Sequence, residues 1–152
     1  MPEAKPHLQL YSVMSRFIRG IQTMDRNEKM CYGVTLSQWY IIDTLLREKL
    51  ITMNELSNEL GLATSTLTRT IDILVRDDIV IRQLNPNDRR KVCVELTENG
   101  QELAQKLKIC SEEFWQKIYD LLPEEKKTQV LEDVQLLVNT LEGANGLCCP
   151  RP

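Results

Sequence analysis

The chain has 152 residues, of which 42% are hydrophobic, enough for one compact domain or for a small domain plus the helices that dimerise it. Its formal net charge is -3, so overall basicity does not mark it as a nucleic-acid binder, and such binding would need a local surface. The N-terminus lacks the apolar core of a signal peptide, and no apolar run approaches the roughly 20 residues that span a bilayer. We therefore expect a cytoplasmic protein with no membrane partner.

An amphipathic helix is predicted over about residues 7–29. Its apolar positions recur at helical spacing and form one stripe that must pack against something: Leu10, Met14, Phe17, Ile18, Ile21 and Met24. A break is expected over residues 31–33. Thr35 or Ser37 can then cap the next helix, which turns Trp39 and Ile42 inward.

Residues 52–97 are the most informative part of the chain. Thr52-Met53-Asn54-Glu55 matches a capping box, so a short helix is expected to begin there and to end at Gly61. A second helix follows, with Leu67, Ile71 and Leu74 in its buried stripe. Residues 79–84 and 91–96 alternate as two strands around a turn-prone loop. Two helices, a strand, a basic loop and a strand are the order of a winged helix-turn-helix, which binds DNA through its second helix and its loop.

The second helix of this pair is the candidate recognition helix. Ser and Thr hydroxyls approach a duplex closely and can donate to phosphates or base edges, while Arg can bind guanine O6 and N7 bidentately. The side chains expected to contact DNA from this helix are Thr64, Ser65, Thr66, Thr68 and Arg69. An ordinary solvated helix face carries the same residue types, so the helix alone does not decide between the two interpretations.

The loop between the strands favours DNA. Arg89, Arg90 and Lys91 place three cations at a hairpin tip, where long side chains can reach a narrow groove of negative potential. Asp88 suits a phosphate surface only if it orients an Arg by a charge-assisted hydrogen bond, so we pair it with Arg90. A turn decorated with solubilising charges is the alternative. Residues 63–96 contain six basic and five acidic residues, which gives this segment a net charge of +1.

Two more helices are predicted after the wing. Thr97-Glu98-Asn99-Gly100 opens a long one, and Pro123 starts another that runs to about Glu142. The tail that follows has no periodicity.

At these residues the sequence resembles the MarR family of winged-helix transcriptional regulators. The motifs that carry the resemblance are Glu55-Leu56, Leu60-Gly61-Leu62, Ser65-Thr66-Leu67-Thr68-Arg69, Asp88-Arg89-Arg90, Leu96-Thr97-Glu98-Asn99-Gly100 and Thr35-Leu36-Ser37-Gln38-Trp39, all within about residues 35–107. The resemblance implies a mainly α fold: a winged helix-turn-helix, with a three-helix core plus a two-stranded β-wing, and N- and C-terminal dimerisation helices. It also implies that Arg90 enters the minor groove and that Asp88 steadies it.

The domain organisation that follows is residues 1–34 as an N-terminal dimerisation helix, 35–98 as the DNA-binding domain, 99–142 as C-terminal dimerisation helices and 143–152 as a flexible cysteine-containing tail. The function that follows is a sequence-specific regulator, a repressor, that binds a pseudo-palindromic operator in double-stranded DNA as a homodimer. A small ligand or thiol modification would release it. Two positions depart from the family pattern: Ala63 precedes the recognition helix, leaving Thr64 as the candidate cap, and Asp77-Asp78 stands where Gly often follows.

Candidate effector residues fall into two groups. Met14, Phe17, Trp39 and Tyr40 could line a pocket for a small aromatic ligand, although aromatic and Met residues at helical spacing also suit a plain core. Candidate thiol sensors are Cys31, Cys148 and Cys149. The alternative for Cys31 is an inert thiol, and the alternative for Cys148 and Cys149 is an unstructured end of the chain with no role. Cys93 and Cys110 are expected in the core, and all five cysteines are expected to be thiols, without a disulfide framework.

Enzymatic, cofactor and metal sites are not expected. The only histidine is His7, and no Ser/His/Asp set, phosphate loop or nucleotide fingerprint occurs. The competing class is a winged-helix protein-interaction module without specific DNA binding, since a fold does not fix a function. A large apolar patch on the recognition face would favour that alternative.

Overall fold

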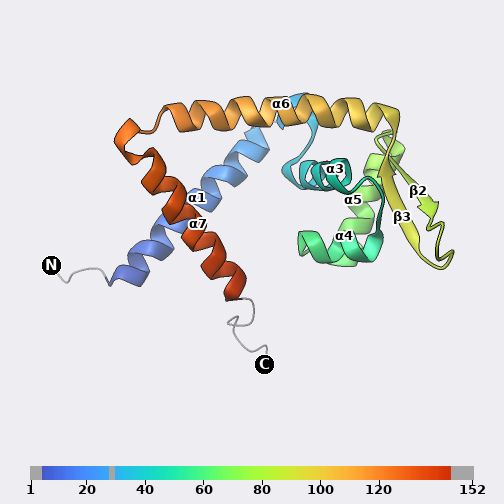
Figure 1. The fold of residues 1–152 in the computed structure, drawn as a ribbon, viewed down its shortest axis with the longest axis horizontal. Coiled ribbons are helices and arrows are strands. Elements are labelled where there is room, and N and C mark those ends of the chain that lie inside the picture. Colours follow the sequence, from blue (N-terminus) through green and yellow to red (C-terminus); the bar gives the residue numbers. More distant parts are fainter. Residues whose placement is uncertain (1–4, 28–29, 145–152) are drawn as a thin grey trace. The chain divides into compact units, whose positions relative to one another are not determined.

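The computed structural model describes residues 5–27 and 30–144, without the side chains of residues 24–27, 30 and 31. The elements in chain order are α1 (Pro6–Asn27), α2 (Met30–Gly33), α3 (Leu36–Glu48), β1 (Ile51–Thr52), α4 (Met53–Leu60), α5 (Thr64–Arg76), β2 (Val80–Leu84), β3 (Val92–Leu96), α6 (Glu98–Asp120), a 3-10 turn (Glu124–Lys126) and α7 (Lys127–Gly143) (Figure 1). The chain divides into one unit that ends at Cys110 and a second that begins at Ser111, so the boundary falls within α6. This is the mainly helical winged helix-turn-helix that the sequence predicts.

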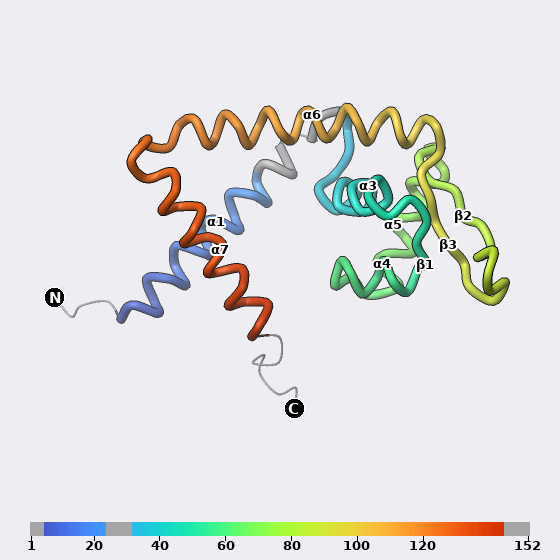
Figure 2. Tube along the Cα trace, in the orientation of Figure 1, coloured from blue at the N-terminus to red at the C-terminus, as the bar shows by residue number. Residues whose placement is uncertain are grey.

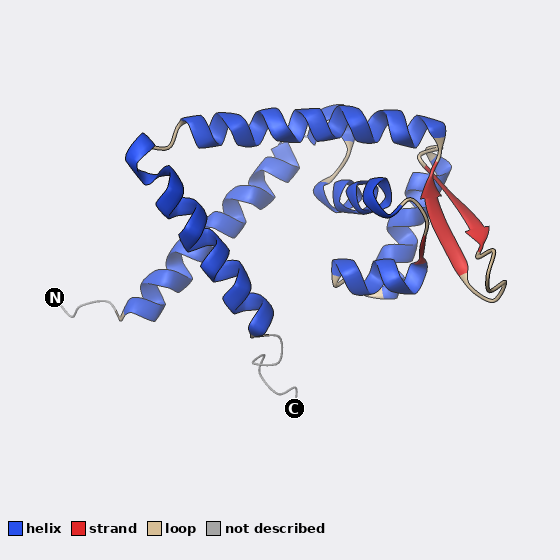
Figure 3. Ribbon diagram, in the orientation of Figure 1, coloured by secondary structure: helices blue, strands red, loops and turns tan. Residues whose placement is uncertain are grey.

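The wing is part of a three-stranded antiparallel sheet of order β1-β3-β2 (Figure 3). Val80 lies opposite Leu96 and Leu84 opposite Val92, so the hairpin has the register expected from its alternation. The third strand, β1, is a two-residue pairing of Ile51 with Val94 and of Thr52 with Cys93. It fixes the start of α4 against the middle of the wing.

The core of the first unit lies among α3, α4, α5, the sheet and the start of α6. Its fully buried side chains come from each of these elements: Ile41, Ile42, Leu45, Leu56, Leu67, Ile71, Val80 and Val94. Ala104 and Leu107 add one face of α6 to the same cluster. The three-helix core with a wing is thus confirmed, and the buried stripe of α5 is the one expected from its periodicity.

Helix starts and ends follow local chemistry at most positions. Pro6 is the first residue of α1, where a missing N–H costs nothing. Thr35 caps α3 in a capping box with Gln38. Gly61 ends α4 in the left-handed conformation, with φ 61°. The break expected over residues 31–33 is instead the short helix α2, which ends where Tyr32 and Gly33 take positive φ.

Thr52 connects β1 to α4 through a second capping box. Its hydroxyl accepts from the Glu55 N–H at 3.2 Å and donates to the Glu55 carboxylate at 2.6 Å, while its own N–H donates to that carboxylate at 2.9 Å. Hydrogen bonds from the Thr52 side chain and then from its backbone lower the pKa of the Glu55 carboxyl. The box therefore orders the first turn of the helix pair.

We expect Thr52→Ala to lower the free energy of unfolding by about 1 kcal/mol, because the α4 start loses its cap. The conservative control, Thr52→Ser, retains the hydroxyl and should stay close to wild type in urea unfolding. The lowered pKa of Glu55 means that its ionised form stabilises the folded state at pH values above the ordinary carboxyl pKa. This stabilisation is lost as the pH falls through the lowered pKa of the folded state, so the stability deficit of Thr52→Ala should shrink over the same interval. A deficit that is constant with pH would remove Glu55 from the explanation.

The recognition helix α5 begins without a side-chain cap. Ala63 is the N-cap in an extended conformation, and the helix starts at Thr64. The expectation that Thr64 caps this helix is therefore wrong, because Thr64 already has helical geometry. At the other end the N–H groups of Asp78 and Ile79 donate to the Val75 and Leu74 carbonyls, and Asp78 has φ 57°. Asp78 thus takes the left-handed position of a Schellman motif that Gly usually fills.

The segment Thr97-Glu98-Asn99-Gly100 ties the end of α5 to the start of α6. The Thr97 hydroxyl donates to the Asp78 carbonyl at 2.6 Å and accepts from the Gly100 N–H at 2.9 Å, and the Asn99 amide donates to the Asp78 carboxylate at 2.5 Å. The Thr97 N–H donates to the Ile79 carbonyl at 3.0 Å. These bonds explain why a Thr and an Asn occur at this junction.

Several helices carry apolar side chains that their own unit leaves exposed. On α1 these are Leu8, Leu10, Tyr11, Val13, Phe17 and Ile18, and on α7 they are Leu131, Val134, Leu136, Val138 and Leu141. Neither helix has a fully buried side chain among those described. At the turn before α7, Lys127 lies over the Tyr119 ring and pairs with Glu124. None of the helices in the described ranges has the length and apolar character to cross a membrane.

Candidate nucleic-acid interface

The outer face of α5 is polar over its first two turns. Thr64, Ser65, Thr66, Thr68 and Arg69 are all exposed, as expected. The Thr68 hydroxyl donates to the Thr64 carbonyl at 2.8 Å, which leaves it only as an acceptor for a ligand. Within the part of the chain that the structure describes, the side chains of Ser65, Thr66 and Arg69 have no hydrogen-bond or ion-pair partner. The Thr64 hydroxyl is likewise unbonded in the described structure, because only its backbone carbonyl accepts from Thr68. Four side chains of the set are therefore free to donate outward.

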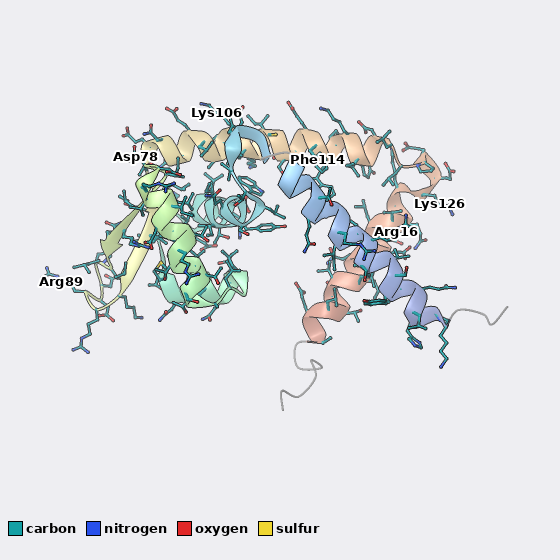
Figure 4. The ribbon with its side chains drawn as sticks, turned by 180° about the vertical axis from the view of Figure 1, so that it is seen from behind. Arg16, Asp78, Arg89, Lys106, Phe114 and Lys126 are labelled. Atoms are coloured by element: carbon teal, nitrogen blue, oxygen red, sulfur yellow. The ribbon has the colours of Figure 1, made fainter. Side chains whose placement is uncertain are left out.

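The wing loop is ordered by its own short side chains. The Asn85 amide oxygen accepts from the N–H groups of Asn87, at 2.8 Å, and Asp88, at 3.3 Å. Lys91 closes the loop, since its carbonyl accepts from the Asn85 N–H at 2.9 Å and its N–H donates to the Asp88 carbonyl at 2.9 Å. Figure 4 shows Arg89 extending from the tip of this hairpin. The loop thus presents its cations on a fixed turn.

Asp88 does pair with Arg90, but not through the guanidinium. The carboxylate accepts from the Arg90 backbone N–H at 3.1 Å. No salt bridge in the described ranges joins the two side chains, so the expected charge-assisted pairing of side chains is wrong. The reason is geometric: in this turn the N–H two residues on is within reach of the carboxylate. Asp88 therefore fixes the backbone from which the Arg90 side chain projects.

A cavity of about 310 Å³ lies between the start of α4 and the base of the wing loop. It is lined by Thr52, Met53, Asn54, Glu55, Asn58, Arg90, Lys91 and Val92. Two of these side chains are cations and one is a carboxylate. Asn54 and Asn58 were not among the expected contact residues, although their exposed positions on a predicted helix four residues apart could have indicated them.

Ion pairing separates the six basic residues of this region into two kinds. Arg76 pairs with Asp77 at 2.9 Å, which raises the Arg76 pKa, and Arg82 pairs with Asp72 at 2.5 Å. Across the described residues, the other four form no salt bridge: Arg69, Arg89, Arg90 and Lys91. The unpaired cations therefore lie on α5 and on the wing loop, where a phosphate backbone would be met.

Comparison with known proteins agrees with this geometry. The sequence profile of the MarR family matches residues 32–91, which span the winged helix-turn-helix. Over this lobe the chain is similar to the MarR family of DNA-binding transcriptional regulators.

Individual MarR-family relatives extend the match beyond the winged lobe. The homoprotocatechuate degradative operon repressor of Escherichia coli is 28% identical over 112 residues, covering 72% of this chain and 76% of the relative. A mutant of Escherichia coli MarR complexed with operator DNA is 26% identical, with a TM-score of 0.69 over 89% of this chain and 99% of that one. Streptococcus pneumoniae FabT in complex with DNA shares the fold, with a TM-score of 0.77 at 21% identity over 91% of this chain and 99% of that one. These matches are to transcriptional regulators, which agrees with the expectation that the protein is not an enzyme.

The expected effector residues are not gathered into one site by any described contact. Trp39 is buried in the core of the lobe and Tyr40 is about half exposed on the same helix, α3. On α1, Phe17 is exposed and Met14 half-buried. None of the four lines either of two cavities in the described part of the chain, one at the wing and one between α3, β3 and α6. An aromatic pocket formed by these residues stays a prediction.

The cysteines differ from one another in burial and in bonding. Cys93 is a buried thiol on β3, as expected. Cys110 is disulfide-bonded, so the expectation of five thiols is wrong, and its partner is not a cysteine whose side chain is described. Cys31 lies in α2 with its side chain outside the described part, and Cys148 and Cys149 lie outside the described residues. In residues 5–27 and 30–144 no group of three or more potential ligands could hold a metal ion.

Proposed function

We propose that this protein is a cytoplasmic, homodimeric repressor that binds a pseudo-palindromic operator and is released by a small aromatic ligand or by thiol modification. The observation that supports DNA binding is the distribution of salt bridges within residues 63–96. The basic residues of this segment that form no salt bridge lie on α5 and the wing loop, whereas Arg76 and Arg82 are paired with aspartates. In this proposal Ser65, Thr66 and Arg69 read base edges in the major groove, and Thr64 and Thr68 lie beside them. Arg89 and Arg90 reach the minor groove, and Asp88 holds the turn.

The exposed apolar faces support a homodimer. Side chains such as Leu8 and Phe17 on α1, and Leu131 and Val134 on α7, are more than half exposed, which is costly for a monomer. Burying them between two copies would make residues 1–34 and 99–142 the dimerisation segments, around a DNA-binding domain at 35–98, with 143–152 as a tail. A two-fold axis then predicts half-sites about 10 base pairs apart.

Selection of bound duplexes from a random-sequence library tests the proposal directly. We expect enrichment of a pseudo-palindromic site, and a mobility shift with the selected duplex but not with a scrambled duplex of the same length. The competing function, a protein-interaction module, predicts no enrichment above the input library. The first turns of α5 favour DNA, since their exposed side chains are hydroxyls and a guanidinium rather than an apolar patch.

Arg69 is the expected base-reading cation. Arg69→Ala should cost about 1–3 kcal/mol of operator binding and relax the preference at one position of each half-site, because one bidentate contact to guanine is lost. Arg76→Ala is the matched control, since Arg76 lies on the same helix but pairs with Asp77. Competition binding with duplexes substituted at each position measures both quantities. An equal loss on every duplex would make Arg69 a phosphate contact.

Repression and release form the second half of the proposal. The relative from Escherichia coli is itself named a repressor of a degradative operon for an aromatic compound, which supports repression and an aromatic effector here. Titrating the selected duplex complex with phenolic acids and with peroxide separates the two release routes. A phenolic acid should act through Met14, Phe17, Trp39 and Tyr40, and an oxidant through Cys31, Cys148 or Cys149.

A further inference from the structure

Arg82 of β2 connects the wing to the recognition helix. Its Nη2 atom lies 2.5 Å from Asp72 Oδ1 and 3.4 Å from the Thr68 carbonyl oxygen, so one guanidinium holds a side chain and a backbone group of α5. Among the salt bridges of the described ranges, this is the one that joins α5 to the wing. The Arg82 side chain is only 34% exposed, although most of β2 faces solvent.

Asp72 lies on the same face of α5 as the proposed base-reading residues. It follows Thr68 by four positions and Arg69 by three, and such spacings place side chains next to each other on a helix. Its carboxylate is 55% exposed. Without a partner, this negative charge would repel a phosphate backbone that approaches α5. Arg82 supplies the neutralising charge from outside the helix.

Apolar packing holds the outer part of the wing only weakly. Val80 is the one fully buried residue of β2, and the strand from Ile81 to Leu84 is exposed. Opposite this outer part, Val92 of β3 is 41% exposed. Beyond Val80, therefore, the position of β2 relative to α5 depends on the strand pairing and on the contact made by Arg82.

We propose that Arg82 is a positioning residue for DNA binding. It neutralises Asp72 and sets the spacing between the base-reading face of α5 and the cations of the wing loop, and it makes no contact with DNA itself. This inference rests on the proposed DNA-binding function. It assigns a purpose to a cation that the charge pattern of the sequence does not distinguish from Arg89 and Arg90.

A double-mutant cycle on the duplex selected by the wild-type protein tests the inference. We expect Arg82→Ala to weaken binding about tenfold with an unchanged salt slope, because no phosphate contact is lost. In the Asp72→Asn background the same substitution should cost less than about threefold, since the carboxylate that needs neutralising is gone. Arg76→Ala, which removes an equal charge from α5, is the control and should change affinity little.

Either of two results, one from binding and one from thermal unfolding, would overturn the inference. An equal loss in both backgrounds, with a smaller salt slope, would make Arg82 a phosphate contact. A large fall in melting temperature that accounts for the weaker binding would make it merely structural, so thermal unfolding of each variant is measured alongside.

Hydrogen exchange of the DNA-free protein separates this inference from the proposed function. We expect Arg82→Ala to speed exchange in peptides that cover residues 81–92 by at least about threefold, while peptides from α3 and α6 stay unchanged. Unchanged exchange in the wing would refute the positioning role even if DNA binds. Faster exchange together with no selected duplex would leave the positioning of the wing supported and the DNA-binding function refuted.

Discussion

Arg90→Ala should weaken binding to the selected duplex by roughly tenfold and reduce the slope of log K against log salt by about 1 per subunit. The cause is the loss of one unpaired cation from a loop whose geometry is fixed by Asn85 and Asp88. Because the Asp88 carboxylate holds the Arg90 backbone, the backbone of the loop loses little freedom when the side chain enters a groove. Fluorescence anisotropy at several salt concentrations measures both quantities.

Two variants serve as controls for this prediction. Lys106→Ala removes the same charge from α6, where Lys106 is exposed, and should leave affinity and slope near wild type (Figure 4). Asp88→Asn keeps an oxygen that can accept from the Arg90 N–H while removing the negative charge, so it should bind as well as wild type or better. If Asp88→Asn instead bound as weakly as Arg90→Ala, the carboxylate charge would matter more than the turn. Unchanged affinity and slope in Arg90→Ala would remove the wing from the mechanism.

The elements of the winged lobe could be predicted because their signals are local. The capping box at Thr52, the left-handed Gly61 and the alternation of the wing strands each depend on residues within a few positions. The outward face of α5 followed from the periodicity of its buried stripe. The candidate DNA-binding surface therefore follows largely from sequence spacing. Figure 2 traces the α5 and β2–β3 segments on which its residues lie.

Side-chain partners could not be predicted in the same way, because they depend on how elements pack. The sequence spacing does not predict that Arg82 pairs with Asp72 while Arg89 and Arg90 form no salt bridge among the described residues. The partner of Asp88, Arg90, is the expected residue, but the donor is its backbone N–H and not its guanidinium, because in a tight turn that N–H is the nearest donor. The hydrogen bond from the Arg90 N–H to the Asp88 carboxylate therefore reflects the geometry of the turn and not the charge of the Arg90 side chain.

The junction between α5 and α6 shows the same division. The motif Thr97-Glu98-Asn99-Gly100 was predicted to start a helix, and it does. Its second purpose, binding the left-handed Asp78 about twenty residues earlier in the chain, appears only in the folded structure. That contact brings two backbone segments so close together that Gly100 has no room for a side chain.

Gly100→Ala should therefore destabilise the protein by about 3 kcal/mol. A Cβ at Gly100 would overlap the carbonyl oxygen of Ile79, would lie 3.0 Å from its carbonyl carbon and would crowd Leu96 at 3.3 Å. The Ile79 carbonyl cannot move away easily, because it accepts the Thr97 N–H and belongs to the turn that ends α5. The new methyl group must push backbone against backbone, and no flexible side chain is available to yield.

Gly143→Ala is the matched control, since a Cβ there meets nothing within 4 Å and the residue lies in α7. In urea unfolding it should equal or slightly exceed wild type, because Ala favours a helix over Gly by up to about 1 kcal/mol. The same gain is available at Gly100, so a net loss there measures crowding rather than helix propensity. Equal stability of Gly100→Ala and wild type would mean that α6 can shift along the end of α5, and the bonds from Thr97 and Asn99 to Asp78 would then no longer explain how the wing is joined to α6.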